Sequence, residues 1–156
     1  MPYTTTGKTT GEEVFELTMS LIDELDDQGE YDTTDTTEYR NRTLSILNVL
    51  RGELYPFSDT YKKNENWASG RRPVVGKLED LDDVIDLDDY ICQSVLPYGL
   101  AAHLLLDENP TTASFFQQRY DELKAELQRG LPVESEDIVD LYGGNNHYYD
   151  QFGMWT

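Results

Sequence analysis

The residues that could carry out chemistry are few and widely spaced. The chain has one cysteine, Cys92, and two histidines, His103 and His147. A zinc site or a cysteine nucleophile requires Cys and His at characteristic spacings, or a base beside the thiol. These three residues show neither pattern, and the sequence has no glycine-rich phosphate loop or nucleophile motif. We therefore expect a protein that is not an enzyme and has no cofactor.

Acidic residues occupy seven of the eleven positions 79–89. A calcium loop alternates its acids with other residues, has Gly at the sixth place and ends in Glu. This run has apolar residues between its acids and no Gly, so we expect no metal. The simpler interpretation is that Asp86 caps the helix that follows. Asp88 and Asp89 would then lie where the positive end of the helix dipole favours them.

Length and charge restrict the class of protein. The 156 residues suit one domain, and 12 basic against 31 acidic residues give a net charge of −19. A basic footprint for nucleic acid is absent, so binding to phosphate over the whole surface is disfavoured. An acidic surface keeps a protein soluble and can line a passage in which DNA slides without sticking. The first residues contain no apolar secretory segment, which favours synthesis in the cytoplasm.

The most apolar stretch, residues 87–107, predicts a central helix. Its apolar residues recur at the period of one helix face. The residues expected in the core are Ile91, Val95, Tyr98, Ala102 and Leu105. The stretch also contains acidic and other polar residues, which makes it too polar to span a bilayer. Pro97 must kink this helix or divide it in two, and we favour one kinked helix because the stripe keeps its phase across the proline.

Three further helices are predicted around it. The first covers residues 10–29 and begins with a Thr10–Glu13 capping box. Its apolar stripe consists of Val14, Leu17, Leu21 and Leu25, supported by Phe15 and Ile22. The second begins at Asp35 and ends before Pro56. The last starts at Asn109-Pro110, an N-cap followed by Pro at the first helical position. The predicted fold is all-α: four main helices, a long irregular loop at about 57–85 and an extended tail.

Two segments outside the helices are candidates for binding a partner. Five basic residues lie within 62–77, a region with few acids, and five aromatic residues lie in the tail. The candidate contact residues are Lys62, Lys63, Trp67, Arg71, Arg72, Tyr142, Tyr148, Tyr149, Phe152 and Trp155. We expect a flexible arm at 1–9, a helical domain at 10–130 and a docking tail at 131–156.

Several segments resemble the small head–tail connector (neck adaptor) proteins of tailed bacteriophages and prophages. The similarity is strongest in LPYGLAAHLLLDENP, residues 96–110. It extends to YRNRTLSILNVL at 39–50, LDDYI at 87–91, FFQQRYDEL at 115–123 and LYGG at 141–144. Together these motifs cover roughly residues 35–145, and they are helical and apolar in character.

The resemblance implies a structural virion protein of the phage neck, made in the host cytoplasm. Its subunits would form a homo-oligomeric ring, twelve-fold in that family, between the portal protein and a downstream tail or stopper protein. DNA would pass through the lumen without specific binding, and no membrane would be involved. The alternative is an acidic binding or regulatory protein of phage origin that mimics DNA. An enzyme subunit is a third possibility, for which no motif is present.

Overall fold

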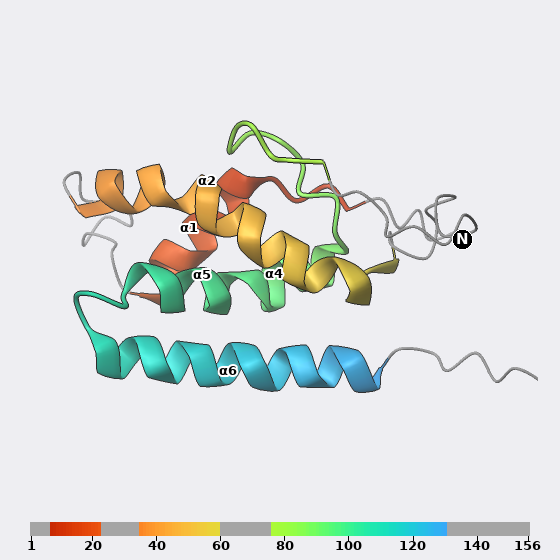
Figure 1. Cartoon of the computed structure of the whole chain (residues 1–156). Coiled ribbons are helices and arrows are strands. Elements are labelled where there is room, and N and C mark those ends of the chain that lie inside the picture. Colours follow the sequence, from red (N-terminus) through yellow and green to blue (C-terminus); the bar gives the residue numbers. More distant parts are fainter. Residues whose placement is uncertain (1–6, 23–34, 60–75, 131–156) are drawn as a thin grey trace, which may run out of the picture.

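The computed structural model describes residues 7–22, 35–59 and 76–130, and it confirms the all-α fold (Figure 1). Within these residues the extended backbone pairing is a single antiparallel bridge between Thr10 and Val84. The elements are α1 Gly11–Leu21, α2 Asp35–Leu54, the 3₁₀ helix η1 Tyr55–Phe57, α4 Asp89–Ser94, α5 Leu96–Leu104 and α6 Pro110–Arg129.

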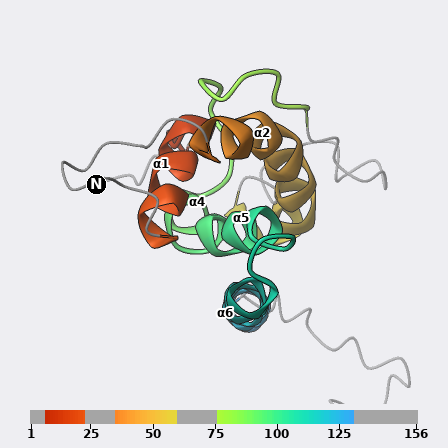
Figure 2. The same cartoon turned by 90° about the vertical axis from the view of Figure 1, so that its left-hand side faces the viewer.

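Helix α5 is the centre of the bundle. It packs against α1, α2, α4 and α6 (Figures 1 and 2). Seven of its nine residues are buried, and Tyr98 and His103 are the two that are not. In Figure 2 α6 lies outside the other helices, on the side of α5 away from α2. Because α5 lies between the other helices, it must be apolar on nearly every side.

Pro97 divides the predicted central helix into two, so the single kinked helix that we favoured is wrong. Val95 alone separates α4 from α5. Proline has no N–H to donate to the carbonyl four residues earlier, and this interrupts the hydrogen-bond ladder. The apolar stripe nevertheless continues across the break. Ile91, Val95, Ala102 and Leu105 are buried, and Tyr98 is half-buried.

Asp88, rather than Asp86, is the N-cap of α4. Asp86 instead has φ of 60°, a left-handed conformation in the chain that leads to the helix. The Asp88 carboxylate accepts hydrogen bonds from the Ser58 hydroxyl at 3.4 Å and the Asp59 N–H at 3.1 Å. It therefore ties the end of the α2–η1 unit to the start of α4.

Helix α1 is shorter than predicted and buries only part of the predicted stripe. The Thr10–Glu13 capping box is present, but the helix ends at Leu21 instead of near residue 28. Val14, Phe15, Thr18 and Met19 face the core, whereas Leu17 and Leu21 remain 39% and 40% exposed. Val14 and Phe15 of the predicted stripe are therefore buried, and the side with Leu17 and Leu21 is left partly open by the described residues.

Backbone hydrogen bonds explain this rotation of α1. Gly11 N–H donates to the Asp83 carbonyl at 3.2 Å, and Glu12 N–H donates to the Leu81 carbonyl at 2.8 Å. On the α2 side, the Arg40 guanidinium pairs with Glu12 and lies 4.9 Å from the centre of the Phe15 ring. These contacts fix the first turn of α1 and direct Phe15 inward.

The residues just before α1 are anchored to α4. The Asp89 carboxylate accepts hydrogen bonds from Lys8 N–H at 2.9 Å, Thr9 N–H at 3.2 Å and the Thr9 hydroxyl at 2.7 Å. These bonds, led by the one from the Thr9 hydroxyl, lower the pKa of Asp89. The last residues of the expected arm at 1–9 are thus held in place, and Thr9 is buried.

The chain between η1 and α4 is fixed by two polar side chains of α2. Arg51 is buried and donates to the carbonyls of Ile85, at 2.5 Å, and Gly76. The Asn48 amide both accepts from Leu78 N–H at 2.8 Å and donates to the Leu78 carbonyl at 3.1 Å. These bonds satisfy backbone groups of residues 76–88, a segment that forms neither helix nor strand.

Helix α6 begins as predicted and packs through one stripe. The Asn109 side chain accepts from Thr112 N–H at 3.2 Å, and Pro110 occupies the first turn. The buried residues are Ala113, Phe116, Tyr120 and Leu123. The Tyr120 hydroxyl donates to Glu53 of α2 at 2.8 Å, and burial and this bond raise its pKa.

Gly99 of α5 lets α6 and α2 approach closely. A Cβ at this position would lie 2.9 Å from two ring carbons of Tyr120 and 3.1 Å from Leu50 Cδ1. Tyr120 is 2% exposed and Leu50 is fully buried, so neither side chain has free space to move into. The backbone of Gly99 is helical, so an unusual backbone conformation does not require a glycine here. The close packing of Tyr120 and Leu50 does.

Gly99→Ala should destabilise the protein by about 1–2 kcal/mol. Overpacking typically costs about 1–3 kcal/mol, and the better helix propensity of alanine offsets up to about 1 kcal/mol of this. Gly52→Ala on α2 is the matched control, since a Cβ added there would have no atom within 4 Å. The control should gain about 0.5 kcal/mol. Urea unfolding measures both, and equal effects would contradict the close contact.

Asp89→Ala should lose stability in a pH-dependent way. Since the folded pKa is lowered, the stabilisation by the carboxylate is present above the unfolded pKa of about 3.9 and disappears as pH falls through the folded value. We expect a loss of about 1 kcal/mol at pH 7 that shrinks towards pH 2, measured by urea unfolding across this range. Asp82→Ala, an exposed acid nearby, serves as control. A loss independent of pH would show that the charge does not hold the anchor.

Candidate interaction surfaces

An apolar groove lies between α1, α4, α5 and α6. Its volume is about 380 Å³. Its walls come from three separate parts of the sequence: the end of α1, the consecutive helices α4 and α5, and the middle of α6. The residues that line it are Leu17, Ser20, Leu21, Tyr90, Gln93, Ser94, Pro97, Tyr98, Arg119 and Leu123.

The apolar side chains of this groove are unusually exposed for so polar a chain. Tyr90 is 59% exposed, and Leu17 and Leu21 are each exposed by about two fifths. Phe115, 64% exposed, lies one helical turn before Arg119 and so continues the same side of α6. Exposed apolar clusters bordered by polar groups are typical of binding surfaces. The groove is therefore a candidate docking site.

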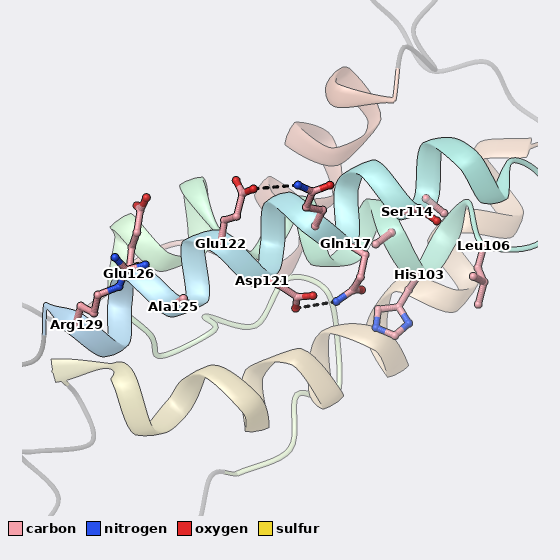
Figure 3. A pocket seen from close by; sticks show the side chains of 12 residues that line it. His103, Leu106, Ser114, Gln117, Asp121, Glu122, Ala125, Glu126 and Arg129 are labelled. Carbon is pink, nitrogen blue, oxygen red and sulfur yellow. Dashed lines mark hydrogen bonds between the residues drawn. The ribbon is translucent and has the colours of Figure 1, made fainter.

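A larger groove, which we call the α5–α6 groove, follows the other side of α6, between it and the end of α5 (Figure 3). Its volume is about 870 Å³, and small residues such as Ala102 and Ala113 line it together with polar side chains. Along its rim Gln117 donates to Asp121 at 3.0 Å, and Gln118 donates to Glu122 at 3.2 Å. These hydrogen bonds stay within α6, so the groove has a hydrogen-bonded acidic edge.

His103 lines this α5–α6 groove and is exposed. The neighbouring residues Ala102 and Leu104 are buried in the core, so the side chain of His103 between them points outward. Arg42 of α2 donates to the carbonyls of His103 at 3.3 Å and Leu104 at 3.4 Å. These bonds satisfy the end of α5 in the way that a C-terminal cation does.

Cys92 is enclosed in the core. The thiol is fully buried and donates to the Leu87 carbonyl at 3.8 Å. Burial, assisted by the charge of Asp89, raises its pKa to about 12. The thiolate is the reactive form, so this cysteine is inert at neutral pH.

Among the described residues, no group of three or more His, Cys, Asp or Glu side chains is arranged to hold a metal ion. In the same part of the chain no helix is long and apolar enough to cross a membrane. The acidic run is accounted for in part by local structure. Asp83, for example, accepts from Glu79 and Asp80 N–H groups, and these bonds lower its pKa.

The candidate contact residues of the sequence lie outside the described residues. This applies to the five in the basic loop, Lys62 to Arg72, to the five in the tail, Tyr142 to Trp155, and to His147. We did not predict the apolar groove from the sequence. Leu17 and Leu21, which line it, were assigned to the apolar stripe of the first helix.

Comparison with protein-family models, with curated proteins and with solved structures finds no match to the chain.

Proposed function

We propose that this protein is a structural subunit of the neck of a tailed phage or prophage, forming a ring adaptor between portal and tail. The observation that carries the proposal is the apolar surface on both sides of α6 that the other described residues leave uncovered. Phe115 and the apolar groove lie on one side, and Leu106, 58% exposed, lies in the α5–α6 groove on the other. A subunit with two different adhesive sides suits repeated association.

A closed ring requires such an arrangement. Each subunit must present one surface to its neighbour ahead and a different surface to the neighbour behind. The outer position of α6 would allow both of its sides to be reached (Figure 2). The resemblance of residues 96–110 and 115–123 to neck adaptors falls on α5 and α6, two of the helices that form these surfaces.

The charge of the chain suits the same role. With a net charge of −19, a subunit repels DNA phosphates, and a ring of such subunits would offer a lumen to which DNA does not adhere. The basic loop and aromatic tail would then contact the portal and a downstream tail or stopper protein. The protein would be made in the host cytoplasm and end in the virion neck.

A DNA mimic is the second candidate, and the described residues favour it less. A mimic needs freely exposed carboxylates that imitate phosphates. Asp88 and Asp89 instead accept hydrogen bonds that hold η1 and the start of the chain against α4, and the Asp83 carboxylate accepts from N–H groups of its own turn. Exposed apolar residues beside α6 also have no role in a mimic.

Phe115→Glu should prevent ring formation while leaving the subunit folded. The protein is co-expressed with the portal protein of the same genome, and the complex is purified and viewed by electron microscopy. We expect a ring at the portal for the unchanged chain and its loss for Phe115→Glu, because burying a charge in an apolar contact is costly. Circular dichroism checks that the variant keeps its helices.

Val49→Glu is the matched control, because Val49 is 59% exposed but lies on α2 and lines neither groove. It should assemble normally. The proposal is wrong if the unchanged chain does not bind portal. The assignment of the contact to α6 is wrong if Phe115→Glu assembles and Val49→Glu does not.

A further inference from the structure

We infer that the apolar groove is the docking site of the chain's own aromatic tail, with Tyr148, Tyr149, Phe152 and Trp155 covering Leu17, Leu21 and Tyr90 in the free subunit. This inference does not rest on the proposed function, since it concerns the isolated chain. It identifies an occupant for an apolar surface that the described residues leave open.

The groove has the chemistry that an aromatic segment requires. Tyr90, Pro97 and Tyr98 offer ring faces, and Leu17, Leu21 and Leu123 supply an aliphatic wall. Stacked or edge-to-face aromatic pairs add about 0.5–1.5 kcal/mol each to the effect of burial. The polar edge consists of Ser20, Gln93 and Ser94, which could bind the backbone of an extended chain.

The charges of groove and tail are complementary. Arg119 is the charged residue of the lining, and it also forms an exposed ion pair with Glu122 at 3.4 Å. An exposed pair of this kind is weak and can be exchanged. Asp150 lies between Tyr149 and Phe152 in the tail, so docking of these rings would bring a carboxylate to the cationic part of the groove lining.

The tail starts close to the groove. It leaves the end of α6 after Gly130, and Leu123 in the groove lies seven residues earlier, about 10 Å along the helix. The 22 residues from Gly130 to Phe152 can span up to about 75 Å, so the tail has ample length to turn back. A tethered segment also has a high effective concentration, which favours the groove of the same chain over that of another copy.

Disulfide trapping in the full-length chain tests the inference. The pair Tyr90→Cys and Phe152→Cys places one thiol in the groove and one in the tail. The pair Val49→Cys and Phe152→Cys is the control, because Val49 is as exposed as Tyr90 but does not line the groove. Native Cys92 can stay, since its buried thiol is unreactive at neutral pH.

Under mild oxidation of dilute protein, we expect the intrachain disulfide to form at least about ten times faster in the groove pair than in the control pair. A docked tail holds its thiol near the groove and so raises the effective concentration of that thiol. Adding Leu17→Glu to the groove pair should bring its rate down to the control level, with circular dichroism confirming the fold. Equal rates in the groove and control pairs would overturn the inference. A predominantly interchain disulfide on a non-reducing gel would also overturn it, because the occupant would then be the tail of a second copy.

Ring formation at the portal is a separate measurement. Failure of the trapping experiment leaves the ring assay unaffected, and a chain that traps its tail but forms no ring would contradict only the proposed function. The two conclusions can therefore be judged independently.

Discussion

The close contact of Tyr120 and Leu50 at Gly99 is the constraint on which the rest of the fold depends. A side chain on Gly99 would collide with Tyr120 and Leu50. Because glycine has no side chain, α6 and α2 can lie against the same turn of α5. The small residues Ala101 and Ala102 continue this narrow region of α5 and are buried in turn. Since α5 touches α1, α2, α4 and α6, the position of each of these helices is defined relative to it.

Polar anchors at the edge of this core determine which surfaces remain open. Asp89 holds the residues before α1, and the carbonyls of Leu81 and Asp83 hold its first turn. These bonds set the rotation of α1, so Phe15 enters the core and Leu17 and Leu21 form one wall of the apolar groove. The groove is thus a consequence of how the start of the chain is fastened.

Much of the fold could be predicted from the sequence, because capping residues and prolines mark the same helix ends that the packing requires. Asn109-Pro110 defined the start of α6, and Pro56 ended α2. Periodicity could not decide which side of α1 is buried, since apolar residues lie on more than one side. The deciding hydrogen bonds come from residues 81–83. Asp86 resembled a cap in sequence, but its left-handed backbone takes it out of the helix. The apolar groove unites three distant segments, which no local pattern reveals, and the basic loop and aromatic tail remain predictions.

Native-state hydrogen exchange tests the central role of α5 most directly. If α5 is the element on which the other helices depend, the amides of Leu100, Ala101 and Ala102 should exchange only through global unfolding. Their exchange free energy should then equal the unfolding free energy from urea titration, while amides near the ends of α1 and α6 exchange through smaller openings. Faster exchange in α5 than in α2 or α6 would contradict the account, because the centre of the bundle would then open while its surroundings stayed folded.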